Sequence, residues 1–184
     1  MKDSEKGNLP RLRSEAYRGL AVGHWIFNIQ GRKQGWLTEL FFVRFQLISA
    51  HAFHRYKIAS PCICLMPDHI HLLLMGYDED HSDQRLAIQF LRRQLKAFLD
   101  PFEFQKTPFD HLLRKEERER DAFQKLAGYI RENPVRAGLV AEEAWRCWPY
   151  ECAVVPGYPE LDTASEDFWD RFWKIYYKIL KSSV

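Results

Sequence analysis

The stretch Cys62–Met75, CICLMPDHIHLLLM, decides the fold of this chain. It is mostly apolar and rich in strand-compatible residues, and it is too short to indicate a helix. The sequence Met66-Pro67-Asp68 interrupts it, which predicts two strands, about 57–65 and 69–76, joined by a tight turn. We therefore expect a hairpin of two buried strands at the centre of the fold.

The second strand of this hairpin carries two histidines, His69 and His71. Side chains alternate along a strand, so both imidazoles project from one face while Ile70 and Leu72 pack on the other. Two imidazoles on one rigid strand can occupy two adjacent corners of a metal coordination shell. On this pair alone, a half-exposed strand with two incidental histidines remains an alternative interpretation.

Length and composition favour one soluble globular domain. The chain has 184 residues, of which 46% are hydrophobic and 15% aromatic, and these values argue against disorder. A net charge of +2 does not by itself indicate nucleic-acid binding, so any basic surface must be local. No apolar run is long enough for a transmembrane helix and no signal peptide is recognisable, so we expect a cytoplasmic protein without a membrane partner.

The cysteines Cys62, Cys64, Cys147 and Cys152 do not have the spacing of a structural zinc site. In a reducing cytosol they are expected to be buried free thiols.

Hydrophobic periodicity predicts the remaining elements. In chain order they are a strand at 24–30, a loop at 31–36, a helix at 37–56 starting near Thr38, a helix at 84–99 stopped by Pro101, a return to the sheet within 102–114, a solvated helix start at 114–121, a helix at 122–133 ended or kinked by Pro134, an irregular wrap at 141–160, and a last helix at 165–180 with Thr163 and Glu166 as its capping box.

These elements suggest three parts of one unit. Residues 1–19 are polar and basic and are predicted to be a mobile arm. Residues 20–150 are predicted to form the main domain, which would carry any active site, and 151–184 a C-terminal wrap and helix packed on the same domain.

Tyr129 and Asn133 are four residues apart at the end of a predicted helix, so they lie on one face. Taken singly, a core tyrosine and a turn asparagine are the more common explanations. Together with the two imidazoles, an amide oxygen would complete a mixed nitrogen and oxygen site that suits Mg²⁺ or Mn²⁺ better than structural zinc. A phenol beside such a cation could attack a phosphodiester.

A basic stripe, Arg85, Arg92 and Lys96, follows one side of the helix at 84–99. Such a stripe is usually a solvated face, but it can also lie along a phosphate backbone.

Three segments, MPDHIHLLLM, FDHLLR and YIRENPVRAGLV, in this order and spacing, resemble the REP-associated tyrosine transposases, a branch of the single-tyrosine HUH transposases. The resemblance covers roughly residues 24–150. It implies a ferredoxin-like α+β fold, in which an antiparallel sheet has helices mainly on one face and the HUH motif lies on a central strand. It also implies a prokaryotic, cytoplasmic protein that acts at the nucleoid.

The resemblance assigns roles to individual residues. His69 and His71 would bind the divalent metal, Mg²⁺ or Mn²⁺, with Asn133 as third ligand, and Tyr129 would be the catalytic tyrosine. The implied substrates are single-stranded DNA hairpins from repetitive extragenic palindromes, cleaved to a 5′-phosphotyrosine and a free 3′-hydroxyl without an organic cofactor. Asp68, Arg131 and Arg136 are candidates for supporting or DNA-contacting roles, which the resemblance does not fix, and Arg131 and Arg136 are the predicted DNA contacts among them.

Other functions remain open from the sequence. A regulator could keep this fold and bind hairpins without cleaving them, through its basic stripe and aromatic residues. A metal-dependent hydrolase could use water in place of the tyrosine as nucleophile. The protein could act as a monomer or as a homodimer.

Overall fold

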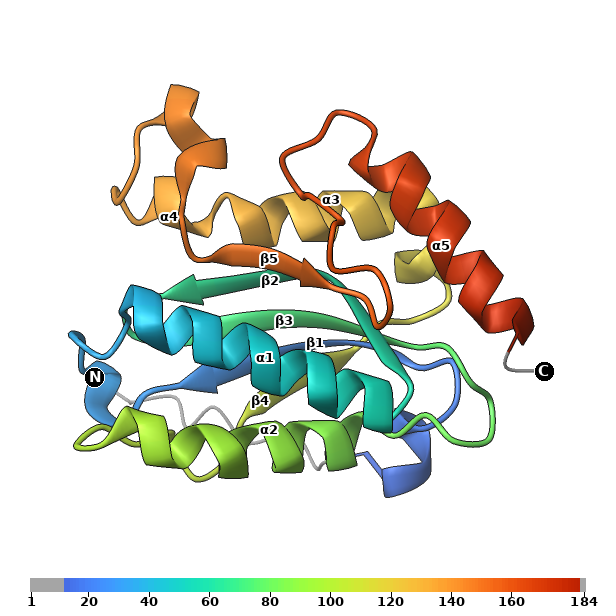
Figure 1. The fold of residues 1–184 in the computed structure, drawn as a ribbon, viewed down its shortest axis with the longest axis horizontal. Helices are drawn as coiled ribbons and strands as arrows, with labels where there is room; N and C mark the ends of the chain where they lie inside the picture. Colours follow the sequence, from blue (N-terminus) through green and yellow to red (C-terminus); the bar gives the residue numbers. More distant parts are fainter. Residues whose placement is uncertain (1–11, 183–184) are drawn as a thin grey trace, which may run out of the picture.

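The computed structural model describes residues 12–182, which form an antiparallel sheet of five strands (Figure 1). The strands are β1 (Val22–Asn28), β2 (Ile58–Met66), β3 (His69–Gly76), β4 (Phe109–Leu112) and β5 (Glu151–Val154). Their order is β4-β1-β3-β2-β5, so β3 is the central strand and each of its neighbours pairs with it in antiparallel register.

In the described part of the chain five α-helices pack on the sheet: α1 (Glu39–Arg55), α2 (Gln84–Leu99), α3 (Arg120–Arg131), α4 (Asn133–Arg136) and α5 (Phe168–Ser182). Short 3₁₀ turns occur at Ser14–Tyr17, Gln30–Arg32, Glu116–Arg118 and Glu142–Cys147.

The helices form two layers. One core joins α1 and α2 to the sheet face that carries Ile70 and Leu72, and the other joins α3 and α5 to the face that carries Leu73 and Met75. Figure 1 places α1 and α3 on opposite sides of β2 and β5. The predicted α+β class is confirmed. The expectation that helices lie mainly on one face is not met, because α3 and α5 form a second helical layer on the other face.

The central hairpin forms as predicted. Nearly every residue of β2 and β3 is buried, and Met66 pairs with His69 at the turn through Pro67 and Asp68. The alternation predicted for β3 also holds, because Ile70 and Leu72 belong to the α1–α2 core whereas His71 does not.

Capping side chains fix the starts of two helices close to the predicted positions. The Thr38 hydroxyl accepts the N–H of Phe41 at 3.1 Å, and the Asp83 carboxylate accepts the N–H of Leu86 at 2.9 Å. The helix predicted at 84–99 is confirmed with the same bounds.

Pro134 ends the third predicted helix in a particular way. α3 stops at Arg131, Glu132 caps it, and Pro134 lies in the first turn of the short helix α4. A proline at that position lacks only an N–H that has no partner within a helix. The helix is therefore interrupted between Tyr129 and Asn133, and the continuous chain goes on directly into α4.

Three sequence predictions need correction. The mobile arm predicted for 1–19 does not include Ser14–Tyr17, since Tyr17 is buried; residues 1–11 lie outside the described part. The irregular wrap at 141–160 contains β5, which pairs with β2. The last helix begins at Phe168, and Thr163 and Glu166 lie in the turns that precede it, so the predicted capping box is wrong.

The four cysteines are free thiols, as predicted; three are buried and Cys147 is exposed. Among the described residues, none of the helices is both long enough and apolar enough to span a bilayer.

Candidate active site

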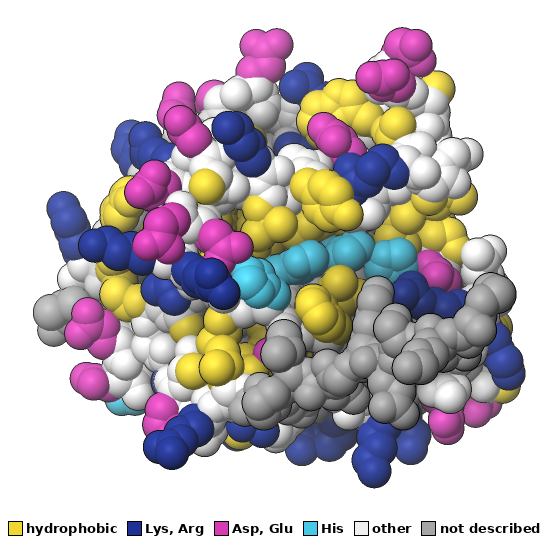
Figure 2. Space-filling view, turned by 180° about the vertical axis from the view of Figure 1, so that it is seen from behind, with side chains coloured by type: hydrophobic (Ala, Val, Ile, Leu, Met, Phe, Trp, Pro, Cys, Tyr) yellow, Lys and Arg dark blue, Asp and Glu magenta, His cyan; other side chains and the backbone are white. Residues whose placement is uncertain are grey.

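A row of histidines crosses the sheet face that α3 and α5 share (Figure 2). The row runs from His69 and His71 on β3 to His24 on β1 and His111 on β4. The antiparallel register produces this row. It pairs His24 with His111 on β4 and with Leu73 on β3, and Leu73 is the next residue after His71 on the same face of β3.

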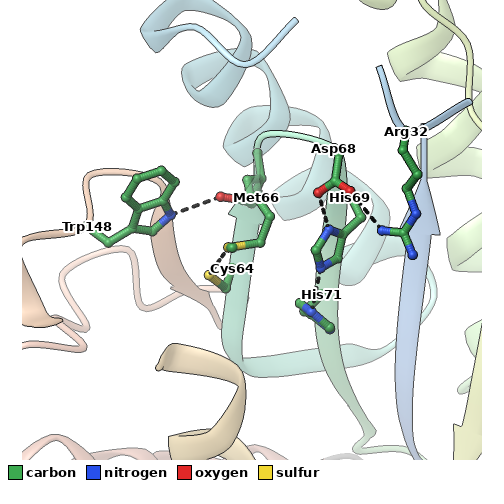
Figure 3. Close-up of polar contacts among 8 residues, drawn as sticks. Arg32, Cys64, Met66, Asp68, His69, His71 and Trp148 are labelled. Carbon is green, nitrogen blue, oxygen red and sulfur yellow. Dashed lines mark hydrogen bonds and ion pairs between the residues drawn. The ribbon is translucent and has the colours of Figure 1, made fainter. Parts of the chain in front are cut away.

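The imidazoles of His69 and His71 converge at their Nε2 edges (Figure 3). The two Nε2 atoms are 2.9 Å apart, whereas the ring centroids are 4.6 Å apart and the ring planes are inclined by 78°. Two ligand atoms at right angles around a cation, each at about 2.1 Å, would be about 3.0 Å apart, and at a tetrahedral angle about 3.4 Å apart. The observed separation is close to the first of these values, so the two Nε2 atoms are near enough to occupy adjacent corners of one coordination shell.

Asp68 orients the first of these rings. Its Oδ1 lies 2.6 Å from Nδ1 of His69, and its Oδ2 accepts a hydrogen bond from Arg32 at 3.0 Å (Figure 3). Burial raises the pKa of Asp68, but the contacts with His69 and Arg32 outweigh it and leave the pKa below its usual value. The carboxylate therefore stays charged and holds Nδ1–H of His69, which turns Nε2 toward the candidate site.

Burial also keeps the histidines uncharged. It lowers the pKa of His71 to about 2 and that of His24 to about 4, and it lowers the pKa of His69 as well. A neutral imidazole has an unprotonated nitrogen that can bind a metal ion.

Tyr129 lies in the last turn of α3. This helix packs over β2, the strand that lies between β5 and β3 in the sheet. On one flank of α3, Arg131 reaches β5, where its Nε lies 2.5 Å from Oε1 of Glu151. Residues two apart on a helix are separated by about 200° around its axis. Tyr129 therefore projects from the flank of α3 opposite Arg131, and its side chain is 55% exposed.

Arg136 links this tyrosine to the histidines electrostatically. Its guanidinium carbon lies 3.9 Å above the centre of the Tyr129 ring, and its Nη2 donates to the Tyr129 carbonyl. After burial and the neighbouring histidines, the charge of Arg136 is a further cause of the lowered pKa of His71, so it lies within electrostatic reach of that ring.

Asn133 begins α4, one turn after Tyr129. Its Nδ2 donates to the Ile130 carbonyl at 2.9 Å, which satisfies the C-terminal end of α3 and fixes the amide. With the amide nitrogen engaged in this way, Oδ1 is the atom that can bind a cation. Within residues 12–182 no three His, Cys, Asp or Glu side chains are grouped to hold a metal ion.

The basic stripe on α2 lies on the other face of the sheet. Arg85 lines a pocket of about 330 Å³ between α2 and β4, and Lys96 is exposed. Arg92 donates to the carbonyls of Gln105 and Lys106. The sheet thus separates this stripe from the histidine row.

Arg131 is 7% exposed and paired with Glu151, and it donates to the Thr163 carbonyl at 2.8 Å. These contacts speak against the predicted DNA contact for Arg131, because a buried, paired guanidinium offers no surface to a phosphate.

Sequence reasoning missed His24 and Arg32. Neither belongs to a motif, and their contacts with His71 and Asp68 depend on strand register and on a turn. The alternation of β1 could have placed His24 on one face, but not beside His71.

No protein-family model matches the chain. Over 145 residues the chain is 30% identical to a REP-associated tyrosine transposase of Haemophilus influenzae, a match that covers 70% of this chain and 78% of that protein. A solved REP-associated tyrosine transposase bound to a REP hairpin has a TM-score of 0.62 at 17% identity, covering 79% of this chain and 81% of its own. A solved transposase from Deinococcus radiodurans has a TM-score of 0.42 at 14% identity, covering 71% and 98%.

Proposed function

Because the chain belongs to the REP-associated tyrosine transposases, we propose that it cleaves and rejoins single-stranded DNA at hairpins of the REP type, with Tyr129 as the nucleophile. The observation that carries this proposal is geometric. Two Nε2 atoms converge at 2.9 Å on the sheet face that α3 covers, and the exposed Tyr129 in the last turn of α3 lies against Arg136, whose charge reaches His71.

The residues around the site fit a divalent cation such as Mg²⁺ or Mn²⁺. His69 and His71 would hold it through Nε2 and Asn133 through Oδ1, which leaves the remaining positions to water and phosphate oxygens. Such a cation would offset the negative charge that develops on the phosphate during attack.

In the proposed reaction the Tyr129 oxygen attacks phosphorus and forms a phosphotyrosine bond, while the bond from phosphorus to the 3′-oxygen breaks. The phenolic proton leaves to solvent, and the released 3′-oxygen takes up a proton to become a hydroxyl. Attack by this hydroxyl on the phosphotyrosine reverses the step and joins strands without ATP, because the covalent link conserves the bond energy.

Arg136 suits this reaction in two ways. Its cation lies over the Tyr129 ring and would help to hold the phenol in place for attack. Its remaining N–H groups could contact the phosphate that the tyrosine attacks.

The test is cleavage of a labelled single-stranded hairpin in Mn²⁺, followed by denaturing electrophoresis. Wild type should give a protein–DNA adduct whose peptide map places the phosphate on Tyr129, and Tyr129→Phe should give none. Tyr177→Phe is the matched control, because Tyr177 is 48% exposed but lies on α5.

Each alternative gives a different result. A hairpin-binding regulator would shift the DNA in a native gel without any cleavage. A hydrolase that uses water would keep cleaving after Tyr129→Phe. Either result would reject the proposed reaction.

A further inference from the structure

We propose that His24 is a positioning residue of the candidate metal site: it accepts a hydrogen bond from Nδ1–H of His71 and so presents Nε2 of His71 to the cation. This inference rests on the proposed function, since it concerns the same cation. It gives a role to a buried histidine that lies outside the motifs described above.

The contact between the two rings has the geometry of a hydrogen bond. Nε2 of His24 lies 2.9 Å from Nδ1 of His71, the ring planes differ by 23°, and the centroids are 5.1 Å apart. This centroid separation is close to the N···N distance plus the two ring radii, so the nitrogens lie between the rings rather than above one another. A lone pair in one ring plane can thus point at an N–H in the other.

Cation binding decides which ring donates. If Nε2 of His71 binds a cation, it carries no proton, so the single proton of the neutral ring is on Nδ1. The atom 2.9 Å from that Nδ1 is Nε2 of His24, which must then accept, and His24 carries its own proton on Nδ1. The bound state therefore defines one tautomer for each ring.

His69 and His71 are supported by different kinds of acceptor. The Asp68 carboxylate accepts from His69 at the partly exposed end of the row. The neutral imidazole of His24 accepts from His71, and both of these residues are more than nine-tenths buried. A second carboxylate at the buried position would cost desolvation energy, whereas an imidazole accepts the same hydrogen bond without a charge.

The backbone holds His24 in place. β1 pairs with β3 on one side and with β4 on the other, so it cannot slip relative to His71 without breaking both ladders. On the opposite face the next residue, Trp25, donates its Nε1–H to buried Gln84 at 2.8 Å. The imidazole of His24 is thus fixed from both sides of its strand.

The experiment measures Mn²⁺ affinity, without DNA, by electron paramagnetic resonance of the free ion. His24→Leu removes the acceptor and should weaken binding at least about ten-fold, the usual effect of losing such a partner. His24→Gln retains a side-chain acceptor and should stay within about three-fold of wild type. His111→Leu is the matched control, because His111 lies opposite His24 in the row but contacts Glu117 at 3.0 Å.

The outcomes separate the two proposals. Wild type that binds no Mn²⁺ overturns the proposed metal chemistry, and this assignment with it. If wild type binds Mn²⁺ and His24→Leu binds it equally tightly, the assignment of His24 alone is overturned. Equal losses in His24→Gln and His24→Leu overturn the hydrogen-bond role, because the ring itself would then be what matters.

A second measurement covers the case in which His24→Leu does not fold. Side-chain ¹⁵N shifts of wild type in saturating Mg²⁺ should identify His71 as protonated on Nδ1 and His24 as unprotonated on Nε2. The opposite pattern at either ring would overturn the assignment.

Discussion

Arg136 makes three contacts with the end of α3. Its guanidinium stacks on the Tyr129 ring at 3.9 Å, forms an ion pair with Glu132 at 3.3 Å, and donates to the Tyr129 carbonyl. These contacts hold a positive charge beside the phenol before any substrate arrives. Such preorganised charge is most effective when it faces the charge that develops in the reaction.

We therefore expect Arg136→Gln to slow hairpin cleavage about ten-fold or more while changing the free energy of unfolding by less than about 1 kcal/mol. The measurement is single-turnover formation of the Tyr129 adduct, with urea unfolding in parallel. Arg146→Gln is the control, because Arg146 also stacks on an aromatic ring, Trp145, at 4.9 Å, but next to Arg131 on the other flank of α3. Equal rates in the two variants would remove Arg136 from the site.

At the scale of elements, the orientation of α3 depends on its buried flank. Arg131 pairs with Glu151 on β5, stacks on Trp145, and donates to the Thr163 carbonyl. The pair joins α3 to the edge strand and to the loop before α5, and this sets the direction in which Tyr129 projects. Burial raises the pKa of Glu151 despite the opposing charge of Arg131.

Breaking this pair should destabilise the fold. Arg131→Met leaves a buried carboxylate without its partner, and we expect a loss of about 3 kcal/mol in urea unfolding at pH 7. The double variant Arg131→Met/Glu151→Leu removes both charges and should recover most of this loss. If Arg131 instead contacts DNA, Arg131→Met would weaken hairpin binding and leave the unfolding free energy unchanged.

The sequence predicted elements well where the determinants are local. For α2, the apolar periodicity lies within the segment and Pro101 lies just after it, and its bounds were predicted correctly. β5 has four residues and is stabilised by pairing with β2, so no local pattern reveals it. Thr163 and Glu166 have the spacing of a capping box, but the Thr163 carbonyl is bound by Arg131 and the helix begins later.

The same distinction applies to the candidate site. Spacing made His69 and His71 candidates on one strand and Tyr129 and Asn133 candidates one helical turn apart, and the family resemblance gave them their expected roles. The flank from which Tyr129 projects depends on the contact between Arg131 and β5, and the position of His24 depends on strand register. Both are tertiary features that spacing along the chain does not encode.

At the scale of the whole molecule, the two central residues of the histidine row, His24 and His71, are buried, whereas the row as a whole reaches the surface at its ends (Figure 2). Two of its rings are 8% and 5% exposed, which places neutral imidazoles inside the folded protein. Stability should therefore depend on acidity even without DNA or metal.

Burial lowers the pKa of His24 to about 4 and that of His71 to about 2, from 6.5. Below pH 6.5 the two histidines bind protons in the unfolded chain but not in the native protein. The stability of the native protein is therefore unaffected by their protonation above that pH, and it decreases as pH falls from 6.5 toward the native pKa values. In EDTA, the free energy of unfolding should drop by about 2 kcal/mol between pH 6 and pH 5, because each excluded proton contributes roughly 1.4 kcal/mol per pH unit. Urea unfolding measures this slope, which His24→Gln should reduce by about half. Wild type should change much less between pH 7 and pH 8, where both rings are neutral in either state. A flat profile from pH 6 to pH 5 would mean that His24 and His71 are solvated in the native protein, contrary to their burial in the structure.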